Sequence, residues 1–410
     1  MKVKECRICK SGSLDVVLDY GQVALADAFL DDLSQVSEEK KYPLNLCICR
    51  NCKHLQIDEI VDPKLLFKNY IYETGVSPSV VSYAEQLTKK LLKIHDSAKN
   101  PTVLEIASND GTGLSFFQKK GCEILGIDPA ENIVEGANQR GIRSIAKFFN
   151  LESAQEIVEE YGNWEIIIAR NVMAHVSDLH GFAGGIKLVL SDKGFASIEV
   201  PHLQTMFEEL QYDQVFHEHI GYHSLDSFQK LFSQYEIEVF DVEKVWVHGG
   251  SIRVYLQHNN GPRKVTSRVT ELIKEESGLG LYDRASWNTF SDRILLHKSA
   301  LKGEITKLRE EGKKVSVYGA SGKGQSLLQF CELGNNLLDY VVDKSKLKQG
   351  KFTPGTHIPI FSNDHIYKEF PDIILLCAWN FSEEIVKQEQ QFAELGGKFL
   401  HPLPMPHFLS

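Results

Sequence analysis

Short apolar runs separated by polar loops recur through the middle of the chain, and they predict buried β-strands. Stretches with the helical spacing of apolar residues lie between these runs, so strands and helices alternate. Strands are expected over 103–106, 123–127, 165–169, 195–200 and 252–257. Helices are expected between them, for example over 151–160 and 179–190, and before them over about 67–98, from Leu66 through Leu92. This alternation predicts a doubly wound α/β sheet.

A second set of apolar runs follows a charged stretch, 264–312, whose helical period suits a connection between domains. Strands are expected over 315–318, 338–342 and 372–377. The first of them leads into the loop G-A-S-G-K-G, which contains Lys323 and precedes a helix. The loop either holds a phosphate group with its amides and its lysine or is a tight turn that packs the helix. A second Rossmann-like unit is therefore predicted, with ligands held between the two units.

The loop after the first central strand carries an acid ahead of its small residues. Glu105 ends the strand, Ala107, Asn109 and Gly111 occupy the glycine positions of E-x-G-x-G-x-G, and Asp128 ends the next strand. A dinucleotide site would instead offer G-x-G-x-x-G to a pyrophosphate. The acid-first order resembles class I S-adenosylmethionine methyltransferases, because a carboxylate suits a cationic methyl donor and the second acid can accept from ribose hydroxyls. The alternative is an ordinary strand–loop–helix turn.

Five of the eight cysteines lie within the first 52 residues. Four of them form two C-x-x-C pairs, Cys6 with Cys9 and Cys49 with Cys52. Four thiolates in two such pairs make a closed tetrahedral zinc site, which is structural and leaves no open position for catalysis. Cys47 and, more weakly, His54 are rival ligands, and reduced cysteines without metal are the alternative. The long spacer between the pairs predicts a small subdomain.

Composition narrows the classes of partner. The 410 residues carry a net charge of -10 without a long basic stripe, which argues against a nucleic-acid partner. No apolar run reaches the length of a membrane span, and the N-terminus M-K-V-K-E-C has no hydrophobic signal region. A cytoplasmic protein is therefore expected, in which cysteines are reduced or bound to metal.

Six histidines lie between residues 175 and 223, near expected strand ends. The segment F-H-E-H, residues 216–219, is not a zincin helix, because H-E-x-x-H needs two intervening residues to place both histidines on one face. A histidine next to an acid is better suited to general-base catalysis. For any single histidine a hydrogen-bonded structural role is the alternative, and only the clustering favours catalysis.

Ten motifs in order resemble the nucleotide-sugar C-methyltransferase family over nearly the whole chain. They are C-R-I-C, Y-P-L-N-L-C-I-C-R-N-C-K-H-L-Q, E-I-A-S-N-D-G, A-R-N-V-M-A-H-V-S-D, E-V-P-H-L, F-H-E-H-I-G-Y-H-S-L, H-G-G-S-I-R-V, V-Y-G-A-S-G-K-G, K-Q-G-K-F-T-P-G-T-H-I-P-I and A-W-N-F-S-E-E-I. Type members of this family methylate carbon 3 of dTDP-linked 4-keto-deoxysugars. The resemblance implies a zinc-binding domain over 1–66, a class I methyltransferase domain over 67–290 and a C-terminal Rossmann-like domain over 291–410.

The resemblance also implies roles for individual residues. The zinc ligands would be Cys6, Cys9, Cys49 and Cys52, and the S-adenosylmethionine site would comprise Glu105, Ala107, Ser108, Asn109, Gly111, Asp128, Pro129, Phe149 and Asn171. The catalytic set would be His219 as the base, Glu218 to orient or tune it, His175, and the tyrosines Tyr72 and Tyr222. The sugar nucleotide, linked to dTDP, GDP or CDP, would contact Tyr70, His202, Ser251, Arg253, Lys323, Lys351, His357, Trp379 and Asn380. A monomer or small homo-oligomer is expected.

One residue departs from the family pattern. The family commonly has a tyrosine with an acid role just before H-E-H, and here that position is Phe216. Protonation of an enolate oxygen would then fall to another group, such as Tyr72, Tyr222 or His175. Other hypotheses also remain at this point: methylation of another acceptor or of oxygen, an NAD(P)-dependent nucleotide-sugar oxidoreductase that uses the 319–324 loop, and a non-catalytic zinc-scaffolded nucleotide-sugar-binding protein.

Overall fold

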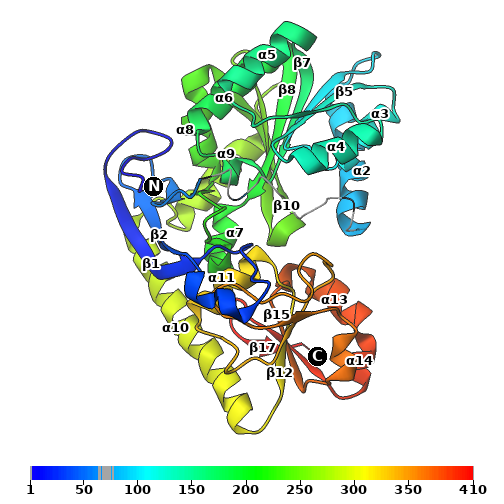
Figure 1. The fold of residues 1–410 in the computed structure, drawn as a ribbon. Helices are drawn as coiled ribbons and strands as arrows, with labels where there is room; N and C mark the ends of the chain where they lie inside the picture. The colour runs from blue at the N-terminus through cyan, green and yellow to red at the C-terminus, as the bar shows by residue number, and fades with distance from the viewer. Residues whose placement is uncertain (1, 63–65, 67–74, 76–77, 410) are drawn as a thin grey trace.

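The chain folds around three sheets, a small one near the N-terminus, a large central one and a third at the C-terminus (Figure 1). The structure is a computed structural model, and it describes all residues except 1, 63–65, 67–74, 76, 77 and 410. The expected residues Tyr70 and Tyr72 lie outside the described residues. Most of the first half of the expected 67–98 helix also lies there, and the described helix is α2 (Pro78–His95).

The N-terminal sheet is antiparallel in the order β1-β2-β3-β9. Its first three strands are β1 (Leu14–Ala24), β2 (Lys41–Cys49) and β3 (Leu55–Ile57), with the 3-10 helix η1 (Leu33–Glu38) between the first two. The fourth strand, β9 (Gly221–Tyr222), comes from a distant part of the chain and pairs with β3. Because β9 directly follows the H-E-H segment, this pairing fixes that segment to the N-terminal sheet.

The central sheet has seven strands in the order β10-β11-β8-β7-β4-β5-β6. Five are parallel, and β11 and β10 pair antiparallel at one end. The expected strands appear as β4 (Thr102–Ile106), β5 (Glu123–Asp128), β7 (Trp164–Arg170), β8 (Leu190–Pro201) and β11 (Ser251–His258). The strands β6 (Ser144–Ala146) and β10 (Ile237–Val245) were not expected from the sequence pattern.

Helices cover both faces of the central sheet (Figure 1). Those that follow the first strands are α3 (Thr112–Gln118), α4 (Glu131–Gln139), α5 (Leu151–Tyr161) and α6 (Leu179–Val189). Later come α7 (Leu203–Glu208), α8 (Leu225–Phe232) and α9 (Ser267–Gly278). Short 3-10 helices occur at η3 (Met173–His175), η4 (Tyr212–Gln214), η5 (Ser233–Tyr235) and η6 (Val247–Gly249). The doubly wound α/β architecture is therefore confirmed.

The C-terminal sheet has the order β14-β13-β12-β15-β16-β17. Its strands are β12 (Val315–Tyr318), β13 (Val341–Val342), β14 (Ile360–Phe361), β15 (Ile373–Leu376), β16 (Lys398–His401) and the antiparallel β17 (His407–Phe408). Its helices are α11 (Gly322–Phe330), α12 (His365–Lys368), η7 (Trp379–Phe381), α13 (Ser382–Gln388) and α14 (Gln390–Glu394). The run expected as a strand over 338–342 is thus shortened to its last two residues.

The long helix α10 (Arg284–Glu310) connects the central and C-terminal parts, as the charged stretch predicts. The expected domain boundary at 290 falls inside this helix. Its buried side chains, among them Trp287 and Phe290, belong to one core that also contains Leu46 of β2, Tyr212 of η4 and Val317 of β12. Because apolar burial is the main favourable term in folding, this shared core holds residues 203–222 between the N-terminal and C-terminal sheets.

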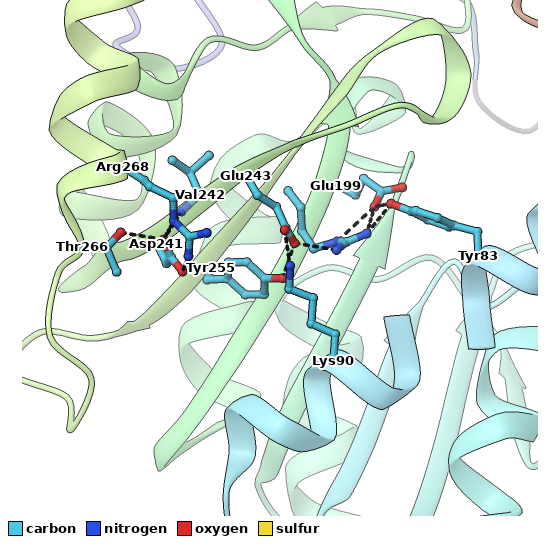
Figure 2. A network of polar contacts seen from close by, with 10 residues as sticks. Tyr83, Lys90, Glu199, Asp241, Val242, Glu243, Tyr255, Thr266 and Arg268 are labelled. Carbon is cyan, nitrogen blue, oxygen red and sulfur yellow. Dashed lines mark hydrogen bonds and ion pairs between the residues drawn. The ribbon is translucent and has the colours of Figure 1, made fainter. Parts of the chain in front are cut away.

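A buried network of charges joins α2 to the central sheet (Figure 2). The guanidinium of Arg253 donates to Glu199 at 3.0 Å and to Glu243 at 2.6 Å, and the hydroxyl of Tyr83 donates to Glu199 at 2.5 Å. Lys90 of α2 completes the network through an ion pair with Glu243. The network spans α2, β8, β10 and β11, so it fixes the position of α2 against the end of the sheet.

We expect the Arg253→Met substitution to lower the free energy of unfolding by about 3–5 kcal/mol, because it leaves the buried carboxylate of Glu199 without its charge partner. The matched control is Arg268→Met. Arg268 also pairs with a strand acid, Asp241, but its side chain is 52% exposed whereas that of Arg253 is 4% exposed. The control should cost less than about 1 kcal/mol. Urea unfolding of both variants tests this, and equal losses would contradict it.

Candidate active site

The loop between β4 and α3 has a backbone shape that few sequences adopt. Ala107, Asn109 and Gly111 all have left-handed φ, of 54°, 50° and 75°. The N–H of Ala107 donates to the carbonyl oxygen of Ile127 at 2.7 Å, which fixes the loop to the end of β5. These three residues occupy the glycine positions of the E-x-G-x-G-x-G pattern. A left-handed backbone favours glycine and asparagine and disfavours large side chains, which explains the residue types found there.

Asp128 lies at the end of β5 and faces this loop. Its two carboxylate oxygens accept from the N–H groups of Asn109 at 3.0 Å and Ala130 at 2.9 Å. Burial raises the pKa of Asp128, and the two N–H donors oppose that effect. Each carboxylate oxygen keeps lone pairs beyond these bonds, so Asp128 can still accept from hydroxyl groups.

Glu105 forms a buried ion pair that the sequence did not indicate. Arg170, at the end of β7, donates to Oε1 of Glu105 at 2.6 Å. Burial raises the pKa of the Glu105 carboxyl, and the adjacent guanidinium opposes that effect. Arg170 therefore orients one oxygen of Glu105 and leaves the other, Oε2, for a ligand.

Three buried acceptor atoms around this loop have no hydrogen-bond partner among the described residues. They are Oε2 of Glu105, Oγ of Ser108 and Oδ1 of Asn171. Asn171 has a left-handed φ of 52°, and its N–H donates to the carbonyl oxygen of Glu199 at 2.8 Å. Buried polar atoms in proteins are nearly always paired, so three unpaired acceptors fit a donor-rich ligand such as the ammonium of an amino acid.

Two other residues expected at this site have different surroundings. Pro129 follows Asp128 and is partly exposed. The ring of Phe149 packs edge-on against Phe182 of α6, with 5.7 Å between ring centroids.

His219 lies in the turn before β9 and has a defined tautomer. Its Nδ1 lies 2.9 Å from the carbonyl oxygen of Gln214. A carbonyl can only accept, so Nδ1 carries the hydrogen and Nε2 keeps its lone pair. Burial, together with the nearby His175 and Lys323, holds the pKa of His219 well below its ordinary value. At neutral pH the ring is therefore uncharged and able to take a proton at Nε2.

His175 and Tyr222 adjoin this base. The rings of His175 and His219 meet edge to face, with 4.8 Å between centroids, and burial lowers the pKa of His175 to about 4. The hydroxyl of Tyr222 donates to the carbonyl oxygen of His219 at 2.8 Å. Tyr222 thus stabilises the backbone of the turn.

Glu218 takes a different position from the one the sequence suggested. Its carboxyl is buried and faces Asp27 and Lys348, and burial and Asp27 raise its pKa well above the ordinary value. The group that orients the His219 ring is the Gln214 carbonyl.

Lys323 reaches this site from the C-terminal part. Its Nζ donates to the carbonyl oxygen of His248 at 2.6 Å and lies 4.9 Å from the ring centroid of Trp379. The indole N–H of Trp379 donates to Asp213 at 2.6 Å. We call His175, His219, His248 and Lys323 the histidine–lysine cluster, since the charge of one member alters the pKa of the others. The charge of Arg170 also lowers the pKa of His248, so the cluster lies within electrostatic range of the Glu105–Arg170 pair.

The loop before α11 has the features of a tight turn. The Ser321 hydroxyl accepts from the N–H of Gly324 at 3.1 Å, and Asp343 accepts from the N–H of Ala320 at 2.7 Å. Ser326 of α11 donates to the carbonyl oxygen of Val215 at 2.6 Å. The helix therefore packs directly against the segment that carries His219.

The remaining described residues expected to contact a sugar nucleotide lie outside the histidine–lysine cluster. Ser251 and Arg253 are buried in β11, and His202 is buried against Glu276 at 2.9 Å. Lys351 pairs with Asp31 at 2.8 Å and His357 with Glu39 at 3.0 Å, where the N-terminal segment meets the C-terminal part. Asn380, in η7, is adjacent to Trp379. Among the described residues of the expected set, the histidine–lysine cluster thus contains His175, His219 and Lys323, and Trp379 packs against Lys323.

The four expected cysteines converge at the edge of the N-terminal sheet. The Sγ atoms of Cys6, Cys9, Cys49 and Cys52 all lie within 4.8 Å of one another. The Cys52 thiol lowers the pKa of Cys6 to about 5. The rival Cys47 is buried with a raised pKa, and the rival His54 packs against His223 with 5.1 Å between ring centroids. The donor set therefore fits a tetrahedral S₄ zinc centre.

Several site residues escaped the sequence analysis. Arg170, Gln214, Asp213 and His248 each contribute a contact, but their types and spacing match no local motif. The one available signal was position, because Arg170 ends a strand next to Asn171 and strand ends carry ligands in open α/β sheets.

In the described part of the chain, no helix is both long and apolar enough to cross a membrane.

The strand order and the loop after β4 define a class I S-adenosylmethionine methyltransferase fold. Three domain families match the chain in succession: a zinc binding domain over 6–67, a methyltransferase domain over 81–242 and a C-methyltransferase C-terminal domain over 246–404. The C-methyltransferase NovU of Streptomyces niveus is 33% identical over 408 residues, which cover 100% of this chain and 97% of that protein. The chain belongs to this C-methyltransferase family and is an S-adenosylmethionine-dependent C-methyltransferase.

Solved structures share parts of the methyltransferase fold. Magnesium protoporphyrin IX methyltransferase from Synechocystis, with bound S-adenosylmethionine, is 10% identical with a TM-score of 0.34, and 44% of this chain matches 79% of that one. The YcgJ protein from Bacillus subtilis is 14% identical with a TM-score of 0.35, and 44% of this chain matches 100% of that one. The strand order and the domain families define the fold class.

Proposed function

We propose that the protein transfers a methyl group to carbon 3 of a nucleotide-linked 4-keto-deoxysugar through an enolate formed by His219. The observation that carries this proposal is the tautomer of His219, a neutral imidazole whose Nδ1 hydrogen is donated to the Gln214 carbonyl and whose Nε2 keeps its lone pair. A proton next to a ketone is acidic enough for such a base to remove. The family resemblance of the sequence supplies the sugar substrate, linked to dTDP, GDP or CDP.

Residues of the β4–α3 loop would hold the methyl donor. S-adenosylmethionine supplies an electrophilic methyl group on a cationic sulfonium. In the proposed site, Asp128 accepts from the ribose hydroxyls, and the unpaired oxygens of Glu105 and Asn171 accept from the methionine ammonium. His219 removes the proton from the sugar carbon, and the fixed positions of base and donor site supply part of the rate by proximity.

The remaining proposals concern organisation. The four clustered cysteines would hold a structural zinc, and the protein would work in the cytoplasm as a monomer or small homo-oligomer. The three-part division at residues 66 and 290 also remains a proposal. Family membership favours neither the oxidoreductase nor the non-catalytic binder considered from the sequence.

We expect Asp128→Asn to weaken S-adenosylmethionine binding by roughly 10- to 100-fold, because a hydrogen bond to a charged acceptor contributes about 1.5–3 kcal/mol. The control is Glu131→Gln, which neutralises an exposed acid three positions further on. Titration calorimetry with S-adenosylmethionine and S-adenosylhomocysteine measures both variants. Unchanged affinity in Asp128→Asn would remove this residue from the proposed site.

Mass spectrometry of 4-keto nucleotide sugars tests the function itself. Each candidate sugar is incubated in deuterated water with enzyme, with and without the methyl donor. We expect deuterium to enter at carbon 3 without the donor, and one methyl group to appear there with it. A methylated oxygen, or no reaction with any dTDP-, GDP- or CDP-linked 4-keto sugar, would overturn the proposal.

A further inference from the structure

The proposed reaction places negative charge on an oxygen, and the site must stabilise it. Removal of a proton beside the ketone moves an electron pair onto the ketone oxygen, which then needs hydrogen-bond donors. The ring nearest the base is Phe216, whose centroid lies 4.2 Å from that of His219, and it has no hydroxyl. The donor must therefore come from another element.

The donors considered from the sequence do not meet this need in the described residues. The hydroxyl of Tyr222 is already donated to the carbonyl oxygen of His219, and burial raises its pKa well above the ordinary value. His175, with a pKa of about 4, is neutral at physiological pH, so its N–H is a weaker donor to an anion than a cation is. The guanidinium of Arg170 is bound to Glu105. A cation with uncommitted donors would stabilise the oxygen more strongly than any of these groups.

Lys323 lies at the end of α11 that packs on Phe216, the ring next to His219. The residue before it, Gly322, packs on the Phe216 ring so closely that a Cβ there would lie 3.1 Å from Cε2. The charge of Lys323 lowers the pKa of both His219 and His248. These observations place the N-terminus of α11, which carries Lys323, against the Phe216 ring, and the Lys323 ammonium within electrostatic range of His219.

The surroundings of Lys323 keep it charged and fixed in place. One of its three N–H groups is donated to the His248 carbonyl, which leaves two for a ligand. Burial lowers its pKa to about 8, and the carboxylate of Asp213 opposes this. Asp213 is in turn held by the indole N–H of Trp379, whose ring lies under the ammonium. At neutral pH the group is mostly an ammonium.

We propose that the Lys323 ammonium donates a hydrogen bond to the ketone oxygen of the substrate and stabilises the enolate that His219 generates. This inference rests on the proposed function and adds a catalytic residue to it. The carbon–hydrogen bond breaks as Nε2 of His219 takes the proton, and the electron pair moves onto the oxygen beside Lys323. When the carbon–methyl bond forms, the carbonyl is restored, the sulfonium becomes a neutral thioether, Lys323 keeps its proton, and His219 releases one proton to solvent.

Deuterium exchange at carbon 3 without methyl donor isolates this step. We expect Lys323→Met to slow exchange about 100- to 1000-fold, the usual effect of losing one oxyanion donor, while affinity for S-adenosylmethionine stays within about twofold. The matched control is Lys298→Met. Lys298 also lies over an aromatic ring, with its Nζ 4.9 Å from the centroid of Phe330, but its ammonium pairs with Glu332. That variant should exchange like the wild type.

Two more variants separate a catalytic role from a structural or binding role. Phe216→Tyr in the Lys323→Met background should recover at least about tenfold of the lost exchange, because it returns a hydroxyl beside His219. With Lys323, the exchange rate should fall as the pH rises through about 8, where the ammonium loses its proton. Lys323→Arg should shift this fall to higher pH, because a guanidinium stays protonated there. The groups that face Lys323 and share in this profile are His219, His248 and Asp213.

Distinct results overturn the inference and the function on which it rests. Exchange in Lys323→Met within threefold of the wild type, with a raised KM for the sugar, would make Lys323 a phosphate-binding residue instead. Slow exchange that the added tyrosine does not recover, together with a lowered unfolding midpoint, would assign it a structural role. Absence of exchange and methylation in the wild type with every 4-keto sugar would refute the proposed function itself.

Discussion

The His219→Asn variant should lose methyl transfer by about 100- to 10,000-fold, the range that a positioned general base contributes. Asparagine can keep the contact to the Gln214 carbonyl but offers no lone pair of comparable basicity. Deuterium exchange at the sugar carbon should disappear with the methylation, because both need the same deprotonation. Affinity for S-adenosylmethionine should remain nearly unchanged. Steady-state kinetics, exchange and calorimetry on one preparation measure all three quantities.

A neighbouring histidine provides the control. His217 belongs to the same H-E-H segment, but its Nε2 lies 3.2 Å from the Pro43 carbonyl oxygen and its ring packs near Tyr42. His217→Asn should therefore lower stability more than turnover. Normal turnover in His219→Asn would refute the assignment of the base. In the wild type, the lowered pKa of His219 keeps the base neutral as pH falls, so the acid limb of kcat/KM should lie below about pH 6.5.

We expect Cys52→Ser to release the zinc ion and to lower the free energy of unfolding by at least about 3 kcal/mol, because structural zinc contributes on the order of 10 kcal/mol of binding free energy. Activity should fall as well. The strand β3 follows Cys52 and pairs Leu55 with Tyr222, so loss of the metal centre loosens the turn that carries His219. Metal content by atomic emission and thermal unfolding measure the two effects.

Cys47→Ser is the matched control for this experiment. Cys47 is a buried cysteine two residues before Cys49, but its sulfur lies outside the four-thiol group. The variant should keep one zinc ion per chain and lose only about 1 kcal/mol of stability. Full zinc content in Cys52→Ser together with zinc loss in Cys47→Ser would show that the ligand set is wrong.

The parts of the site that the sequence could predict are those that local spacing encodes. The C-x-x-C pairs place two thiols on one tight turn, and the acid-first loop requires small residues where the backbone is left-handed. Both patterns involve neighbours along the chain, so they can be recognised in the sequence without knowledge of the packing. The alternation of strands and helices follows from burial in the same way, and it predicted five of the seven central strands. In the short strand β6 and the antiparallel strand β10, the pattern of apolar residues was too weak to predict a strand.

Contacts between distant residues could not be predicted in this way. The expectation that Glu218 orients His219 relied on adjacency, whereas the ring nitrogen of His219 bonds to the Gln214 carbonyl and Glu218 faces Asp27 and Lys348. Arg170 and Glu105 are 65 positions apart, and only the parallel pairing of β4 with β7 brings them together. The register of such a pairing depends on the core as a whole.

The sequence by itself determined the two C-x-x-C pairs, the methyl-donor loop, the two Rossmann-like units and the family, because these features depend on the local spacing and order of residues. Only the tertiary structure decided how they form one site. The shared core packs α11 against the His219 segment, and Ser326 bonds to Val215 across 111 positions. Lys323 reaches His248 across 75 positions in the same way. The physical reason is that apolar burial selects these long-range contacts by overall shape, which no local pattern of residues specifies.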